Sequence, residues 1–424
     1  MSQNIGWRAD VKARLRASGY KLTDFEPKLG KDSKRPAAIA YAANADGDLV
    51  PWLAVEVRDS SKPPAAALPS LLASRDLLGT SDHYAVINGE WYRADRSLRS
   101  FQRVDGPVAP PHGECGIVQD VSLATALVAD RLWYEADRAR GTESRSDLPQ
   151  LPDIFAETST PGIEMPSGEF VAVQADVLWQ ARRQAISLFA SRTSLDHPTP
   201  PPAITNAIAL LTGNRLGGRV LDPFCGTGGL LWAAIDRAIQ LGLYPKFHGQ
   251  DINARIVGLA EAIARVAPLQ TTVRAGDSLC TELPQANIVV SAPPFGMRLN
   301  EPYELLDGME TRDGDAAAID RCLRHLPPGG RAVLLASSAI TFRVALERYR
   351  RFVASEFRVG AVIALPGGCL SNTGIRTVIL VIDRDSAGET FVAQLGEDWQ
   401  TQLSPGGAAL NAAQQHLDGF IDGE

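Results

Sequence analysis

Short apolar runs alternate with longer segments of helical periodicity along the second half of the chain. From residue 219 onward the runs are RVLDPF, FHGQDI, TTVRAGD, NIVVSAP, RAVLLAS, FRVGAVIAL and TVILVID. Apolar strands that are separated by helices are typical of a parallel sheet whose two faces are covered. The pattern therefore predicts a doubly wound α/β domain over residues 196–384.

A smaller α/β domain is predicted near the amino terminus, over residues 1–103. Trp7 to Ser18 has the spacing of an amphipathic basic helix, and residues 65–79 have the spacing of a second helix. Two pairs of strands about Gly-containing turns are also predicted: Ala37–Ala42 with Leu49–Arg58, and HYAVING with EWYRAD.

Stretches rich in Gly and Pro divide the chain. They are VDGPVAPPHGECG after Phe101, the polar stretch from Gly141 to Gly168, and DHPTPPP at 196–202. Apolar residues at helical spacing predict helices over 120–140 and 172–192. The expected parts are a small α/β domain (1–103), a linker and helical segment (104–195), the larger α/β domain (196–384) and an acidic tail (385–424).

Composition and charge exclude several classes of protein. Hydrophobic residues make up 45% of the 424 residues, which excludes a disordered chain and a fibrous repeat. The net charge is −7, from 42 Lys and Arg against 49 Asp and Glu, so contact with nucleic acid requires a local basic patch. Residues 1–35 hold nine basic and four acidic residues, whereas residues 385–424 hold seven acidic and no basic ones. On general grounds the favoured interpretation is a solvated basic helix and a solvated acidic tail.

Cysteine and histidine spacing gives no metal site. The five cysteines lie far apart without a Cys-x-x-Cys pair, and the six histidines have no ligand spacing. Widely spaced cysteines fit a reducing compartment. No stretch of about 18 apolar residues is present, so a cytoplasmic protein without a membrane segment is expected.

The strongest motif ends the first strand of the larger domain, in Leu221-Asp-Pro-Phe-Cys-Gly-Thr-Gly-Gly229. Three glycines in four residues let the backbone approach a ligand at the carboxyl end of the strand. Asp251 and Asp277 end the next two strands, where their carboxylates can accept bonds from ribose hydroxyls and an adenine amine. A single acid at a strand end is usually a cap or turn former. Three on consecutive strands favour a nucleotide site.

The series resembles the S-adenosylmethionine-dependent methyltransferases, and more narrowly the adenine-N6 DNA methyltransferases and the methylation subunit of type I restriction–modification systems. The resemblance covers roughly residues 196–384 and implies a Rossmann-like sheet that binds S-adenosylmethionine. It also implies DNA as substrate and a specificity or restriction subunit as partner. The implied cofactor contacts are Thr199, Pro200, Asp222, Phe224, Gly226, Thr227, Gly228, Asp251, Ile252, Asp277 and Ser278.

The catalytic segment departs from the family pattern. Members carry Asn, Asp or Ser before Pro-Pro-Phe, and the aromatic ring stacks on a flipped-out adenine. Here the implied catalytic residues are Ala292, Pro293, Pro294 and Phe295. Ala292 has no acceptor for the adenine amine, and Ser291, one place upstream, is expected to face the other way. The loss is expected to cost on the order of 10²–10³ in rate, as for a lost oxyanion donor. A bulge that brings in Ser291, or another group that holds the amine, would avoid it.

The amino-terminal domain resembles that of type I restriction subunits, which belong to an Asp…Glu-x-Lys nuclease superfamily. That chemistry needs an Asp on the preceding strand, but alanines stand there. Arg58 replaces Lys after Glu56, and guanidinium does not deprotonate. A degenerate nuclease fold that contacts DNA or protein is expected; an unrelated α/β module is the alternative. Its basic residues form a candidate phosphate-binding patch: Lys12, Arg14, Arg16, Lys31, Lys34 and Arg35.

The sequence thus favours a protein similar to DNA adenine-N6 methyltransferases, of doubtful activity, in a restriction or phage-defence context. Residues 385–424 are too few for a DNA-recognition domain, so sequence specificity is expected to come from a partner subunit or to be absent. A non-catalytic cofactor-binding scaffold is the main alternative. A methyltransferase acting on RNA or protein is another, because related loops occur in both.

Overall fold

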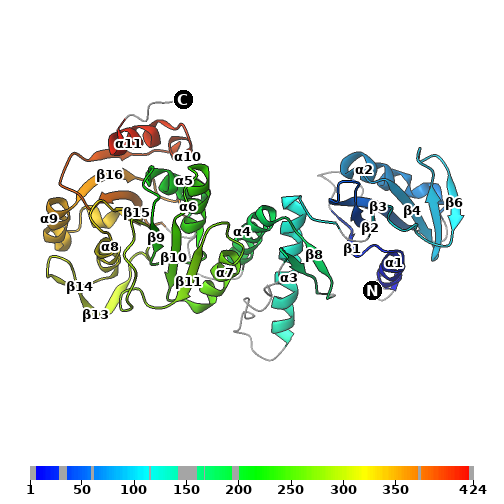
Figure 1. The fold of residues 1–424 in the computed structure, drawn as a ribbon, viewed down its shortest axis with the longest axis horizontal. Coiled ribbons are helices and arrows are strands. Elements are labelled where there is room, and N and C mark those ends of the chain that lie inside the picture. Colours follow the sequence, from blue (N-terminus) through cyan, green and yellow to red (C-terminus); the bar gives the residue numbers. More distant parts are fainter. Residues whose placement is uncertain are drawn as a thin grey trace. The chain divides into compact units, whose positions relative to one another are not determined.

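The computed structural model describes residues 6–27, 36–58, 62–113, 116–141, 160–166, 168–192, 200–370 and 374–419. The chain forms two compact units. The first consists of Met1–Glu143 with Ile154–Ala185, and the second of Ser144–Asp153 with Ile186–Glu424. Both are drawn in Figure 1. No helix among the described residues is both long enough and apolar enough to cross a membrane.

The first unit contains a six-stranded sheet whose strands lie in chain order. The strands are β1 (Leu22–Phe25), β2 (Ala38–Ala43), β3 (Leu49–Arg58), β4 (Asp82–Ile87), β5 (Glu90–Ala94) and β6 (Phe101–Val104). Only β3 and β4 are parallel, and α2 (Leu68–Leu78) connects them. On α1 (Gly6–Ala17), Val11 and Leu15 pack into the core of this sheet. The predicted strands and helices are confirmed; β1 and β6 were not predicted, because each is only four residues long and partly polar.

The helices predicted over 120–140 and 172–192 are present as α3 (Val121–Gly141) and α4 (Ala175–Arg192). Between them lies an antiparallel hairpin of β7 (Gly162–Glu164) and β8 (Phe170–Ala172), which the sequence pattern did not predict. Each hairpin strand is only three residues long, too short for a period of two to be recognised.

The second unit is built on an eight-stranded sheet in the order β11-β10-β9-β12-β15-β17-β16-β18. The strands are β9 (Arg219–Asp222), β10 (Lys246–Asp251), β11 (Thr271–Ala275), β12 (Ile288–Ser291), β15 (Arg331–Ser337), β16 (Arg358–Ala364), β17 (Thr377–Asp383) and β18 (Phe391–Gln394). The doubly wound α/β fold is confirmed. The chain direction reverses at β17, which is antiparallel to both neighbours. A strand buried on both faces has the same apolar pattern in either direction, so the sequence did not reveal this.

Helices follow the strands of this unit in alternation. They are α5 (Pro202–Leu211), α6 (Gly229–Gln240), α7 (Ala254–Ala264), α8 (Gly314–Arg324), α9 (Glu347–Glu356), α10 (Trp399–Gln402) and α11 (Ala408–Asp418). A hairpin of β13 (Arg298–Glu304) and β14 (Glu310–Asp313) separates β12 from α8. Strand order changes direction between β9 and β12, and ligands of such sheets bind beyond the carboxyl ends of the strands at this point.

The expected acidic tail over 385–424 is corrected by the structure, because most of this segment belongs to the sheet domain. Strand β18 pairs in parallel with β16, and α11 packs against α5 and β16 (Figure 1). Leu410, Ala413 and Leu417 of α11 are buried at helical spacing. The prediction of a tail was wrong because it rested on the net charge of the segment and not on the spacing of its apolar residues.

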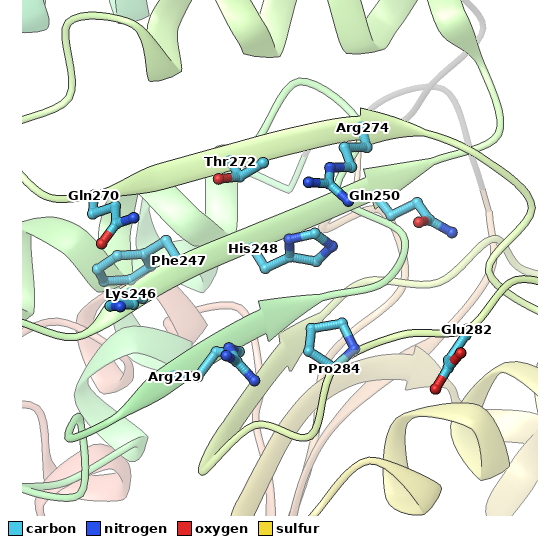
Figure 2. A pocket seen from close by; sticks show the side chains of 10 residues that line it. All are labelled: Arg219, Lys246, Phe247, His248, Gln250, Gln270, Thr272, Arg274, Glu282 and Pro284. Atoms are coloured by element: carbon cyan, nitrogen blue, oxygen red, sulfur yellow. The ribbon is translucent and has the colours of Figure 1, made fainter.

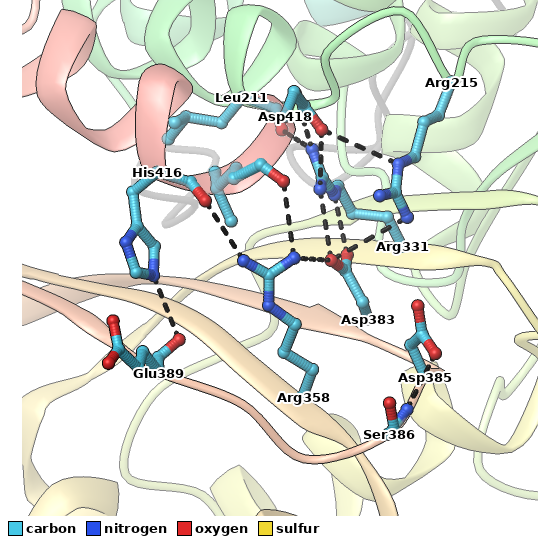
Figure 3. A network of polar contacts seen from close by, with 11 residues as sticks. Leu211, Arg215, Arg331, Arg358, Asp383, Asp385, Ser386, Glu389, His416 and Asp418 are labelled. Carbon is cyan, nitrogen blue, oxygen red and sulfur yellow. Dashed lines mark hydrogen bonds and ion pairs between the residues drawn. The ribbon is translucent and has the colours of Figure 1, made fainter. Parts of the chain in front are cut away.

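A buried ion network fastens α11 to the sheet (Figure 3). Arg331, at the start of β15, is fully buried and forms two bonds to Asp383 at the end of β17, of 2.7 and 3.1 Å. The same guanidinium lies 3.0 Å from Asp418 of α11 and donates to the carbonyl of Leu211 at the end of α5. Arg215 and Arg358 lie within 4 Å of Asp383. One arginine therefore joins four segments that are far apart in the sequence.

Candidate active site

The glycine loop leaves β9 at Asp222 and enters α6 at Gly229. Gly228 has φ +87°, and a Cβ there would lie 2.2 Å from the Trp232 ring. The Trp232 indole N–H donates to the Thr227 carbonyl at 2.8 Å. Only glycine fits at residue 228, because its φ is positive and the Trp232 ring fills the space that a side chain would take.

Asp251, at the end of β10, holds this loop in place. Its Oδ2 accepts the Gly226 N–H at 2.9 Å, and its Oδ1 accepts the Asn253 N–H at 2.9 Å. A carboxylate oxygen can accept more than one hydrogen bond, so the residue type suits both the loop and the hydroxyl donors of a ligand. The adjacent Ile252 is 73% exposed, which is unusual for a large apolar side chain beside a buried strand. It is free to cover a flat ring.

Ser278 ties the ends of three neighbouring strands together. Its buried hydroxyl donates to the carbonyl of Pro223 after β9 and accepts the Gln250 amide of β10 at 3.0 Å. The half-buried Asp277, next to it, accepts the Leu279 N–H at 2.9 Å. Ser278 thus positions the loops, whereas Asp277 keeps acceptor capacity for a ligand.

Asp222 is almost completely buried beneath the loop. Its pKa is raised to about 7, mainly by burial and also by the charge of Asp251, while hydrogen bonds from the Ser291 hydroxyl and the Phe224 N–H lower it. The Ser291 bond is 2.7 Å long and the Phe224 bond 3.1 Å. Asp222 therefore titrates near neutral pH.

The segment Ala292–Phe295 follows β12 directly. Ser291 is fully buried and pairs in register with Leu334 of β15, with no bulge. Its hydroxyl bonds Asp222, so the prediction that Ser291 faces away from Ala292 is confirmed. Pro293 is buried, whereas Ala292, Pro294 and Phe295 are partly exposed. The structure therefore does not contain the bulge that would bring Ser291 into the site.

Asp315 anchors the catalytic segment and was not singled out from the sequence. It lies in the first turn of α8, is buried, and its Oδ1 accepts the Gly296 N–H at 2.7 Å. Burial is the main cause that raises its pKa. Its Oδ2 has no hydrogen-bond partner among the described residues. Asp315 follows Asp313, which caps α8, so in the sequence it looked like part of a helix start.

The strand ends bring most predicted site residues to one edge of the sheet. Residues 222–228, 251–252, 277–278 and 292–295 follow β9, β10, β11 and β12, which are neighbouring parallel strands. Pro200 lies half-buried just before α5, and Thr199 is outside the described residues. The site is therefore assembled from four turns that are distant in the sequence.

A sheet with this strand order, a glycine loop after its first strand and acids after the next two defines the Rossmann-like fold of S-adenosylmethionine-dependent methyltransferases. A family model described as N-6 DNA Methylase matches residues 175–403, more than half of the chain. The chain belongs to the N-6 DNA methylase family.

Individual relatives are more distant. The chain is 31% identical over 137 residues to the tRNA (guanine(6)-N2)-methyltransferase of Thermus thermophilus, covering 32% of this chain and 38% of the relative. It is 23% identical over 203 residues to the type I restriction enzyme EcoEI methylase subunit of Escherichia coli, covering 42% and 41%. The type I methyltransferase subunit structure from Streptococcus thermophilus has a TM-score of 0.48 and 20% identity, covering 57% and 58%. The chain spans less than half the length of the curated relatives it matches.

Proposed function

We propose that this chain binds S-adenosylmethionine and transfers its methyl group to the N6 amine of adenine in DNA, within a restriction–modification system. The observation that carries the proposal is the glycine loop, anchored by Asp251, beside the Pro-Pro-Phe segment after β12. The family match supports the reaction, and the type I methylase relative supports the context. A specificity or restriction subunit is the partner that this context implies.

The residues at the strand ends fit the cofactor. The glycines at 226 and 228 let the loop backbone approach the cofactor closely. The carboxylates of Asp251 and Asp277 lie at the strand ends where ribose hydroxyls and an adenine amine would bind. Ile252 is exposed enough to cover the adenine ring. The bound cofactor supplies a methyl group on a sulfonium cation, and an ionised carboxylate at Asp222 favours this positive charge.

The target base is held by the catalytic segment. The Pro293 carbonyl accepts a hydrogen bond from the amine, and the Phe295 ring stacks on the flipped base. Ala292 adds no acceptor and the Ser291 hydroxyl is bound to Asp222, so transfer is expected to be slow. The same two features support the alternative of a cofactor-binding scaffold without catalysis.

A second candidate substrate is a guanine N2 amine in RNA. The observation in its favour is the 31% identity to a tRNA (guanine(6)-N2)-methyltransferase. Both reactions methylate an exocyclic amine of a purine, so the same loop and aromatic ring serve either base.

Methyl incorporation from radiolabelled S-adenosylmethionine into DNA, tRNA and protein tests the proposed function. Label is expected in DNA, and Asp251→Ala is expected to abolish both incorporation and cofactor binding, because the glycine loop loses its anchor. Label in tRNA alone would favour the second candidate substrate, a guanine N2 amine in RNA. Cofactor binding without methyl incorporation into any polymer would favour the alternative of a non-catalytic, cofactor-binding scaffold.

Cofactor affinity is expected to depend on pH through Asp222. The free protein holds its pKa near 7, and a cation bound beside the carboxylate favours the ionised form. Calorimetry should therefore find S-adenosylmethionine binding about tenfold weaker at pH 6 than at pH 8. Asp222→Asn keeps the acceptor for Ser291 and should flatten this profile. An unchanged profile in the variant would exclude Asp222 as its cause.

A further inference from the structure

One face of strands β9, β10 and β11 carries polar side chains. A Cβ on Gly249 would meet Leu231 of α6, so the alternate residues of β10 point away from that helix. These residues are Lys246, His248 and Gln250. Register pairs Lys246 with Arg219 of β9, and Gln250 with Arg274 of β11. Side chains of all three strands therefore gather on the face opposite α6.

These side chains line a cavity of about 380 Å³ (Figure 2). The rest of its wall comes from residues before β11 and from the loop between β11 and β12. The lining residues are Arg219, Lys246, Phe247, His248, Gln250, Gln270, Thr272, Arg274, Glu282 and Pro284. Three permanent cations thus share one cavity with several neutral hydrogen-bond donors and a single carboxylate, Glu282.

The ion pairing of these three cations differs from that of other arginines of this unit. Arg324, Arg331 and Arg358 each lie within 4 Å of an acidic side chain. Within the described ranges, no ion pair forms at Arg219, Lys246 or Arg274; Arg219 donates to the Gln285 carbonyl. In a chain of net charge −7, such a cluster is a local positive patch.

The environment of His248 reflects this positive charge. Burial lowers its pKa, and the charges of Arg274 and Arg219 lower it further. Lys246 and Glu282 are the other charged groups that line the cavity with it. The imidazole is therefore mostly neutral at pH 7, and an anion in the cavity would favour its protonation.

We propose that this cavity binds backbone phosphates of a nucleic acid, at a place separate from the turns that hold cofactor and base. The inference rests on the proposed function for the choice of a nucleic acid over another polyanion. Guanidinium, ammonium and neutral amide or hydroxyl donors together suit phosphate oxygens. Gln250 lines the cavity and also bonds Ser278, so the phosphate site adjoins the cofactor loops.

The basic helix of the first unit is a weaker candidate for this contact. Arg14 donates to the Asp105 carbonyl, and Arg16 forms an ion pair with Glu169 at 2.9 Å. Lys31, Lys34 and Arg35 of the patch predicted from the sequence lie outside the described residues. Arg16 thus has a carboxylate partner, whereas among the described residues no carboxylate pairs with Arg219, Lys246 or Arg274.

The test is the salt dependence of duplex DNA binding, followed by fluorescence anisotropy. Lys246→Gln combined with Arg274→Gln removes two exposed cations, and Arg351→Gln, a pair partner of Glu347 on α9, is the matched control. The slope of log K against log salt should fall in magnitude by about 1.8 in the double variant, since each phosphate contact contributes about 0.9. The control should keep the wild-type slope, and cofactor affinity should stay unchanged in both.

Lower pH should strengthen wild-type DNA binding as His248 takes up a proton, and His248→Gln should lose this part of the pH dependence. An equal slope in wild type and double variant would overturn the phosphate site, even where wild type methylates DNA. Binding of the wild-type protein to polyglutamate, a polyanion without phosphates, but not to DNA would also overturn the phosphate site. A smaller salt slope in the double variant, in a protein that transfers no methyl group, would support the phosphate site and contradict the proposed activity.

Discussion

Ala292→Asn is expected to raise the rate of methyl transfer to DNA by a factor of about 10²–10³. Removal of one positioning hydrogen-bond group in an active site has an effect of this size. The asparagine amide oxygen would accept a hydrogen bond from the adenine amine beside the Pro293 carbonyl. Ala292 is only partly buried, which leaves space for the larger side chain. Ser291 cannot take this role while its hydroxyl bonds Asp222. Single-turnover kinetics with labelled cofactor measures the gain.

Ala292→Val is the matched control, because it adds bulk without an acceptor and should not gain activity. Ala292→Ser and Ala292→Asp restore the other residue types of the family pattern and should gain smaller amounts. If asparagine and valine behave alike, the missing acceptor does not limit the reaction. Another group, such as the Oδ2 of Asp315, would then be the next to remove.

Arg331→Met is expected to destabilise the second unit by about 3–5 kcal/mol, the range for breaking one side of a buried ion pair. The side chain is fully buried and contacts Asp383, Asp418 and the Leu211 carbonyl. Methionine fills similar space but leaves buried Asp383 with only the longer contacts from Arg215 and Arg358. The midpoint of thermal unfolding should fall by roughly 6–20 °C.

Arg351→Met provides the comparison, because Arg351 is 80% exposed in its pair with Glu347 and such pairs contribute about 0–1 kcal/mol. Calorimetric unfolding of both variants separates a buried network from a surface pair. Equal stability of the two would mean that the network contributes no more than an exposed ion pair.

Local patterns were sufficient for most of the longer strands and helices of both units. The motif at Asp222–Gly229 and the acids at Asp251 and Asp277 predicted the strand-end site, because parallel strands bring their carboxyl ends to one edge. Orientation of Ser291 followed from the alternation along β12 and is confirmed by its bond to Asp222.

Other features depend on tertiary contacts that no local pattern contains. Arg331 starts an apolar strand, where a charged residue usually turns to water, and its burial depends on Asp383 and Asp418, 52 and 87 residues away. The antiparallel β17 and the added β18 have no directional signature. Asp315 contacts the catalytic segment only because the chain after Phe295 folds back onto α8. The nuclease-like origin of the first unit stays a prediction.

The chemical identity of the methylated nucleoside tests the central claim most directly. DNA is incubated with the protein and deuterium-labelled S-adenosylmethionine, digested, and analysed by mass spectrometry, with Asp251→Ala as the blank. The account predicts labelled N6-methyladenine from wild type and more of it from Ala292→Asn. Labelled methylguanine from RNA, with no labelled adenine in DNA from either protein, would contradict it.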